Sequence, residues 1–165
     1  MLVFATSDKG GTGRSVTSCN VAYRSALSGS DVCYLDFDFG SPTAGAVMHI
    51  NEVLSGTTEG GLHSYLRGKI AEPKQIDVWS ASERNSLRSR PPLAGRLVLL
   101  PGDIGGGEFT SSPEVVQRCA KLLLRLEEEF DVCFIDLSAG RSYATEMVLA
   151  ATAEPQFAHI VCRWL

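Results

Sequence analysis

One short segment near the start of the sequence combines residue types that suit phosphate binding. Residues 7–15 read SDKGGTGRS, with three glycines, two cations and three hydroxyl side chains. Glycine lets the backbone turn tightly and direct its N–H groups at an anion, a following helix adds the positive end of its dipole, and Lys or Arg adds charge. A glycine loop before a helix is also common as a simple tight turn, so both interpretations stay open for this segment alone.

Carboxylates follow two apolar segments further along the chain. Asp36 and Asp38 end the first segment, and Asp136 ends the second, shortly before Ser138 and Gly140. Ligands of open α/β sheets bind beyond the carboxyl ends of the strands, so we expect these groups to meet the glycine loop at one edge. Taken one at a time, acids at strand ends are often helix caps or solvated residues. Together with the loop, they are what a magnesium-bound nucleotide requires.

The hydrophobic pattern predicts the elements that position these groups. Continuous apolar runs predict buried strands, and amphipathic segments without Gly or Pro predict helices. Strands are expected at 2–5, 31–38, 96–100, 131–136 and 157–162, and helices at 14–27, 47–54, 62–67, from a start signal at 110–114 to about 129, and at 143–152. The first strand, loop, helix and strand form a βαβ unit. We predict an α/β fold of three layers, a mainly parallel sheet with helices on both faces.

The composition is that of an ordinary globular protein. The chain has 165 residues, 15 Lys or Arg against 19 Asp or Glu, a net charge of -4 and 44% hydrophobic residues. These values predict a single domain over residues 1–165 and exclude disorder and collagen-like repeats. The mild acidity argues against a whole surface built for nucleic acid. No apolar run reaches the roughly 20 residues that span a bilayer, and the start lacks a signal peptide, so we expect a cytoplasmic protein.

Three further sets of residues are less informative. The five cysteines are scattered without a CxxC pair, which predicts reduced core thiols, and the three histidines lack metal-ligand spacing. The segment 80–96 is polar and proline-broken, and its arginines predict an exposed basic loop that contacts DNA, an acidic partner or anionic lipid, or that is simply solvated. The glycine run at 105–107 has no assigned role.

Three motifs together resemble a known family. Residues 9–15, KGGTGRS, resemble the deviant Walker A loop of the MinD/ParA class of P-loop ATPases, whose pattern is KGGxGK followed by Ser or Thr. The segment 36–38 resembles the first switch of that family, and 130–140 resembles its second switch and Walker B strand. The matches occur in the family's order and span residues 1 to about 140. The resemblance implies a P-loop NTPase fold that uses ATP and Mg²⁺.

The resemblance also implies a role for each matching residue. Lys9 would reach across an ATP-sandwiched homodimer to the partner's phosphates, and Asp38 would orient or activate the attacking water. Nucleotide binding would fall to Gly10, Gly11, Thr12, Gly13, Arg14, Ser15 and Val16, and magnesium binding to Ser15, Asp36 and Asp136. The implied output is a dimer that forms with ATP, dissolves on hydrolysis and positions a cargo, with a protein, DNA or a membrane as its partner.

Two residues depart from the family pattern. Arg14 stands where the family has the Walker A lysine, and Asp8 stands where it has the first glycine of the loop. The flat guanidinium of arginine cannot simply take the place of a lysine ammonium. Asp8 adds a negative charge close to the expected phosphates. These departures predict that ATP hydrolysis is weakened while nucleotide binding survives.

The sequence leaves three functions for comparison. The first is a MinD/ParA-like ATPase switch that positions cargo, and the second is a degenerate relative that binds nucleotide as a regulatory ligand with little or no hydrolysis. The third, a bacterial protein-tyrosine kinase, is disfavoured because the chain has no tyrosine-rich tail.

The length adds one more expectation. The resembling ATPases are considerably longer, and residues 163–165 directly follow an apolar segment. We therefore expect the chain to be the N-terminal, phosphate-binding part of a longer protein, or the ordered fraction of that protein.

Overall fold

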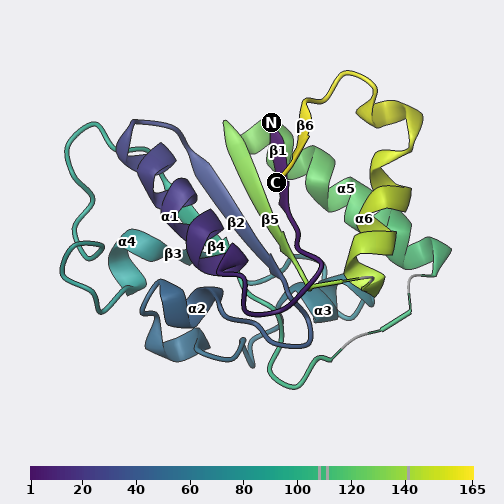
Figure 1. Cartoon of the computed structure of the whole chain (residues 1–165), viewed down its shortest axis with the longest axis horizontal. Helices are drawn as coiled ribbons and strands as arrows, with labels where there is room; N and C mark the ends of the chain where they lie inside the picture. Colours follow the sequence, from purple (N-terminus) through teal and green to yellow (C-terminus); the bar gives the residue numbers. More distant parts are fainter. Residues whose placement is uncertain (108, 111, 141) are drawn as a thin grey trace.

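A six-stranded sheet forms the centre of the molecule (Figure 1). The computed structural model describes residues 1–107, 109–110, 112–140 and 142–165. The strands, in the order β3-β4-β2-β5-β1-β6, are β1 (Leu2–Ala5), β2 (Val32–Phe37), β3 (Ile76–Asp77), β4 (Leu97–Leu100), β5 (Val132–Leu137) and β6 (Cys162–Trp164). Neighbouring strands are parallel except for the β3–β4 pair. The predicted mainly parallel sheet is confirmed.

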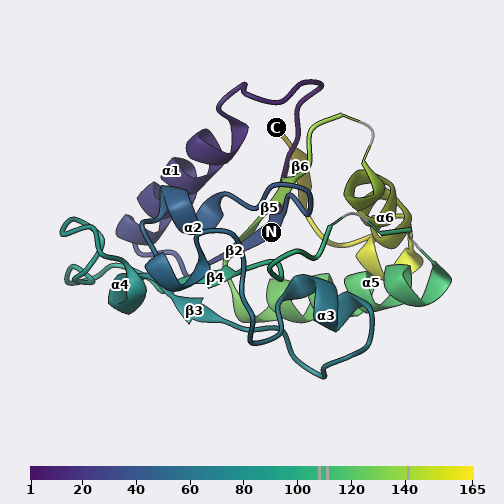
Figure 2. The same cartoon turned by 90° about the horizontal axis from the view of Figure 1, so that it is seen from below.

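Helices cover both faces of the sheet and complete the three predicted layers (Figure 2). They are α1 (Arg14–Leu27), α2 (Ala44–Val47), α3 (Leu62–Leu66), α4 (Val78–Ala81), α5 (Pro113–Glu129) and α6 (Tyr143–Thr152), with short 3₁₀ turns η1 (Asn51–Val53) and η2 (Pro155–Phe157). One apolar core joins α3, α5 and α6 to the sheet. The other joins α1, α2 and α4 to its opposite face.

The apolar strands are continuous because their alternate side chains enter different cores. In β1, Leu2 and Phe4 pack in the core under α5 and α6, whereas Val3 packs in the core under α1. The same alternation separates Leu35 from Tyr34 in β2. A strand covered on both faces has no solvent side, and it therefore needs apolar residues at every position.

Several predicted boundaries agree with the structure. The helices at 14–27 and 143–152 are confirmed to the residue, and the long helix begins at Pro113 after the cap Ser112. The predicted helix at 47–54 is wrong: α2 ends at Val47, and η1 begins at Asn51. Between them His49 has a φ of 54°, which interrupts a right-handed helix.

The predicted strand at 157–162 is also wrong. The turn η2 ends at Phe157, the first residue of the predicted strand, and strand β6 begins only at Cys162. Pairing with β1 sets this position, since Leu2 lies opposite Cys162 and Phe4 opposite Trp164. The rings of Phe4 and Trp164 stack at 4.7 Å between centroids. The short edge strand β3 was not predicted.

The basic segment at 80–96 is only partly the exposed loop that the sequence predicts. Arg84, Arg88 and Arg90 are exposed. Arg96 instead anchors the end of the segment, because its Nε donates to Asp31 at 2.9 Å and its Nη1 to Glu129 at 3.1 Å. The exposed basic surface therefore consists of the first three arginines, of which Arg88 lies 3.8 Å from Glu83 and Arg90 donates to the Ala94 carbonyl at 2.7 Å.

The glycine run at 105–107 lies against a buried histidine. The ring of His63 is so close that a Cβ added at Gly106 would lie 2.4 Å from it. The backbone N–H of Asp103 donates to His63 Nδ1 at 2.9 Å. These contacts give the loop a packing role next to α3. All five cysteines are free thiols, and four of them are buried.

Within the described ranges, none of the helices has the length and apolar character needed to cross a membrane.

The close packing of α2 against η1 predicts a clear effect on stability. A Cβ at Gly45 would lie 2.0 Å from the backbone oxygen of Val53, so Gly45→Ala must displace the backbone. We expect a loss of about 1–3 kcal/mol in the free energy of unfolding, measured by urea denaturation. Gly40→Ala is the control, because nothing lies within 4 Å of its added Cβ. Equal stability of the two variants would contradict the packing described.

Candidate functional site

The glycine loop leaves β1 and enters α1 in a form that suits an anion. Gly11 and Gly13 have φ values of 76° and 79°, in the left-handed region that favours glycine. Gly13 is the N-cap of α1, and among the described residues no side chain caps this helix end. The first turn of α1 also lacks an acidic residue. Its N-terminal N–H groups and dipole are therefore available to a negatively charged ligand.

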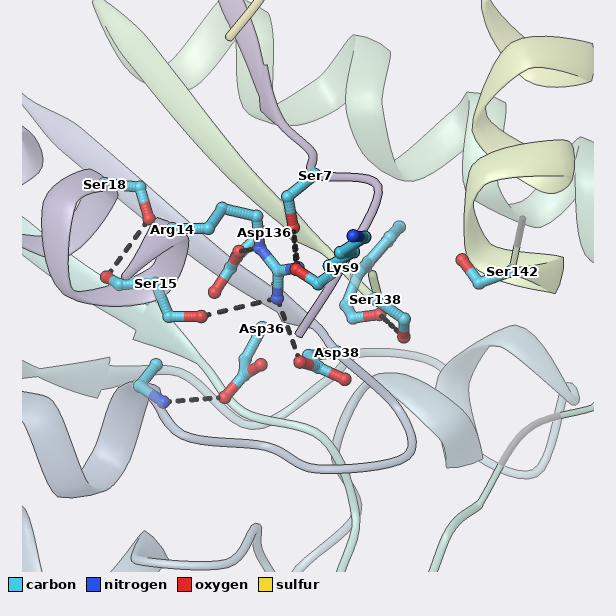
Figure 3. Close-up of polar contacts among 12 residues, drawn as sticks. Ser7, Lys9, Arg14, Ser15, Ser18, Asp36, Asp38, Asp136, Ser138 and Ser142 are labelled. Carbon is cyan, nitrogen blue, oxygen red and sulfur yellow. Dashed lines mark hydrogen bonds and ion pairs between the residues drawn. The ribbon is translucent and has the colours of Figure 1, made fainter. Parts of the chain in front are cut away.

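Arg14, the first residue of α1, turns inward to the carboxylates (Figure 3). Its Nε donates to Asp136 Oδ1 at 2.5 Å, and its Nη2 donates to Asp38 Oδ2 at 2.9 Å. Longer contacts join Nη1 to Ser7 Oγ at 3.3 Å and Nη2 to Ser15 Oγ at 3.4 Å. One guanidinium thus connects the glycine loop, β2 and β5.

This ion-pair cluster is well shielded from solvent. The side chains of Arg14 and Asp136 are 10% and 0% exposed, and that of Asp38 is 17% exposed. Burial alone lowers the pKa of Arg14, but the charges and hydrogen bonds of Asp136 and Asp38 outweigh it, and the pKa is raised. Arg14 is therefore a permanent cation within the site.

A third carboxylate, that of Asp36, lies directly beside Asp136. Asp36 on β2 is the register partner of Asp136 on β5, and both are buried. Asp36 Oδ2 accepts a hydrogen bond from the Ala44 N–H at 3.0 Å. Burial raises the pKa of Asp36 to about 7; the Ala44 N–H opposes this shift, and the charges of Asp136 and Asp38 add to it. Asp36 therefore keeps its proton to a higher pH than an exposed aspartic acid does.

A hollow of about 460 Å³ lies in front of the loop. The seven residues predicted to bind nucleotide, 10–16, all line it, together with Asp38. The structure also places Ser41, Thr43 and Ala139 in its wall, which the sequence did not indicate. Ser41 and Thr43 could have been predicted, because they are hydroxyl residues that closely follow a strand ending in Asp. Ser7 was likewise not predicted as a partner of Arg14.

The predicted site residues fall into two groups. Arg14, Ser15, Asp38 and Asp136 are joined by the contacts described, and Asp36 lies next to Asp136. Lys9 stands apart: it is exposed, it does not line the hollow, and it has no ion pair within the described part of the chain. Its cross-dimer role stays a prediction.

The predicted magnesium ligands supply the right atoms but do not fit the ion as arranged. Asp36 Oδ1 and Asp136 Oδ2 are buried and have no hydrogen-bond partner among the residues described, and carboxylate oxygens suit Mg²⁺. However, the other oxygen of Asp136, together with Asp38 and Ser15, is in contact with the Arg14 guanidinium. A divalent cation at these oxygens would meet a fixed positive charge.

Comparison with known proteins places the fold. No protein-family model matches the sequence, and no curated protein matches it significantly. Among solved structures, the septum site-determining protein MinD of Pyrococcus horikoshii OT3, complexed with Mg-ADP, matches 91% of this chain at a TM-score of 0.62 and 18% identity. The pNOB8 ParA protein bound to nonspecific DNA matches 91% at 0.60 and 15% identity.

A third match has a different biochemical name. Cobyrinic acid a,c-diamide synthase from Mycobacterium smegmatis matches 92% of this chain at a TM-score of 0.59 and 19% identity. This chain spans 54%, 50% and 56% of the lengths of the three proteins, about half of each. The chain therefore has the fold of MinD/ParA-type P-loop ATPases, and at this identity the likeness extends to the fold alone.

The raised pKa of Asp36 predicts how stability depends on pH. A carboxyl whose pKa is higher in the folded state binds more protons when folded, so its contribution falls as pH rises from about 4 to about 7. The slope is on the order of 1.4 kcal/mol per pH unit. Asp36→Asn, which keeps an acceptor for Ala44, should abolish this component.

The test is the difference in unfolding free energy between wild type and Asp36→Asn, measured in urea at several pH values. The variant should gain relative stability from pH 4 to pH 7 and hold that gain above it. Asp8→Asn, at an exposed position, is the matched control for the removal of one carboxylate. A flat difference for Asp36→Asn would contradict the shift.

Proposed function

We propose that this chain is a nucleotide-binding regulatory protein of the MinD/ParA kind, with ATP as its ligand. The observation that carries the proposal is the glycine loop at the uncapped start of α1, facing a hollow lined by residues 10–16. Backbone N–H groups and a helix dipole are the usual means of holding phosphates. The choice of ATP rests on the resemblance of the loop and on the fold, whose neighbour MinD was solved with Mg-ADP.

The proposed protein hydrolyses ATP slowly. In-line attack on a γ-phosphate needs a water positioned by a polar group, the role that the resemblance assigns to Asp38. One oxygen of Asp38 is already held by Arg14 at 2.9 Å, so this carboxylate is oriented toward the guanidinium. This favours the regulator that binds nucleotide over the rapid ATPase. The predicted Mg²⁺ would compete with Arg14 for Asp136 Oδ1 and would be repelled by the guanidinium charge.

A nucleotide-dependent homodimer is the second part of the proposal. Lys9 is an exposed residue of the loop and does not line the hollow of its own chain, which is compatible with a role on a partner. In one nucleotide state the protein would bind a protein or DNA partner, and in the other state it would release that partner. Arg84, Arg88 and Arg90 offer an exposed basic surface for an acidic partner.

ATP binding and phosphate release test the main proposal. We expect wild type to bind a fluorescent ATP analogue and to release little phosphate. Gly13→Ala should weaken binding at least tenfold, since alanine is strained at a φ of 79° and would distort the loop. Gly40→Ala, outside the wall of the hollow, is the control. Absence of ATP binding by a folded wild-type protein would refute the proposal.

Replacing Lys9 by Ala tests the dimer. Sedimentation velocity should show an ATP-dependent dimer for wild type and a monomer for Lys9→Ala, while the variant's own loop still binds nucleotide. Lys69→Ala, another exposed lysine outside the hollow, controls for the loss of one surface charge. An unchanged ATP-induced dimer in Lys9→Ala would remove the cross-dimer assignment.

A further inference from the structure

We propose that Arg14 takes the place of a divalent cation in this site, so that nucleotide phosphates bind without a metal ion. The statement about nucleotide binding rests on the proposed function. The statement about the metal ion concerns the protein without nucleotide and is tested independently of that function. The starting observation is the guanidinium that bridges Asp136 and Asp38 at 2.5 and 2.9 Å.

The first step concerns charge. Asp136 is fully buried, and a buried carboxylate needs a compensating cation or a proton. Arg14 is the cation that contacts it, and the same side chain also contacts Asp38. The site therefore already contains the positive charge that a bound metal ion would otherwise provide.

The second step concerns space and ligands. Mg²⁺ demands a nearly octahedral set of oxygens at about 2.0–2.1 Å. Asp136 Oδ1, Asp38 Oδ2 and Ser15 Oγ are all contacted by Arg14, so a metal ion would compete for these atoms. Asp36 Oδ1 and Asp136 Oδ2, which have no partner among the described residues, are too few to complete an octahedral shell. Repulsion between the ion and the guanidinium would add to this competition.

The shape of the guanidinium group suits Arg14 to this bridging position. Guanidinium has five N–H donors in a planar fork and can contact several acceptors at once, whereas an ammonium is a compact point charge. Arg14 uses three nitrogens toward four side chains, from Ser7 in the loop to Asp136 on β5. Lysine at this position could not hold both carboxylates in the same way.

The fourth step concerns phosphate. With Asp136 and Asp38 paired to Arg14, the floor of the site repels an anion less than free carboxylates would. The loop N–H groups and the start of α1 then supply the contacts to phosphate. A metal ion is not needed to screen the ligand from these two acids.

Manganese binding tests the metal part without nucleotide. Mn²⁺ is titrated into wild type, Arg14→Met and Arg14→Lys, and the free ion is followed by electron paramagnetic resonance. We expect at least tenfold tighter binding by Arg14→Met than by wild type, and an intermediate gain for Arg14→Lys. Adding Asp136→Asn to either variant should remove the gain. Equal binding by wild type and a folded Arg14 variant would overturn the proposal.

Folding is checked by circular dichroism, because Arg14→Met leaves a buried carboxylate unpaired. Arg14→Lys keeps the charge and serves as the test if Arg14→Met does not fold. Should neither variant fold, Mn²⁺ binding is compared between wild type and Asp38→Asn: similar weak binding by both supports the proposal, and at least tenfold weaker binding by Asp38→Asn overturns it, because wild type would then use Asp38 as a metal ligand and not as the partner of Arg14.

Nucleotide binding tests the remaining part. Wild type should bind the ATP analogue equally, within about twofold, in Mg²⁺ and in EDTA, whereas Arg14→Lys should require Mg²⁺. At least tenfold tighter wild-type binding with Mg²⁺ would overturn the metal-free mode. Loss of ATP binding under both conditions, with Mn²⁺ behaving as expected, would refute the proposed nucleotide function and leave Arg14 as the resident cation.

Discussion

The site depends on one buried ion pair, Arg14 with Asp136. Asp136 has no exposed surface at the end of β5, and an unpaired charge there would be strongly destabilising. Arg14 comes from the first turn of α1, so this pair fixes the helix start against the sheet. The same guanidinium holds Asp38 beyond β2. The position of the glycine loop relative to both strands follows from these contacts.

The parallel sheet brings the acids together before any ligand is considered. β2 and β5 are neighbours with Asp36 opposite Asp136, and both strands point their carboxyl ends at the loop after β1. Three carboxylates in one place repel each other, and the structure relieves this in two ways. Arg14 pairs with two of them and offsets one unit of their negative charge, and burial raises the pKa of Asp36 to about 7.

Much of this arrangement could be predicted from sequence because it depends on local patterns. Apolar runs that end in Asp located β2 and β5, and the connection rule for parallel strands placed their ends beside the loop. The orientation of Arg14 could not be predicted, since a side chain at the start of a helix can turn toward solvent, phosphate or the sheet. That choice depends on Asp136, 122 residues away in the chain.

The errors in the fold have the same origin. Strand β6 is positioned by its pairing with β1 and by the stacking of Trp164 on Phe4, and neither is visible in the apolar segment itself. The interruption after α2 depends on the left-handed backbone conformation of His49. The presence of a histidine in the sequence does not predict that conformation. Long-range pairing and single backbone conformations are what a local pattern does not contain.

The fold alone does not decide the chemistry of the site, which depends on the side chains that the loop and the strands carry. The solved structures of a MinD protein, a ParA protein and a cobyrinic acid a,c-diamide synthase all resemble this fold, so the fold by itself does not define one function. In this chain the cation at position 14 faces the carboxylates. A guanidinium held by Asp38 and Asp136 lowers the net negative charge of the site and fixes the orientation of both carboxylates. Arg14, one of the two residues that depart from the pattern of the family that the loop resembles, is thus also the residue that connects the site.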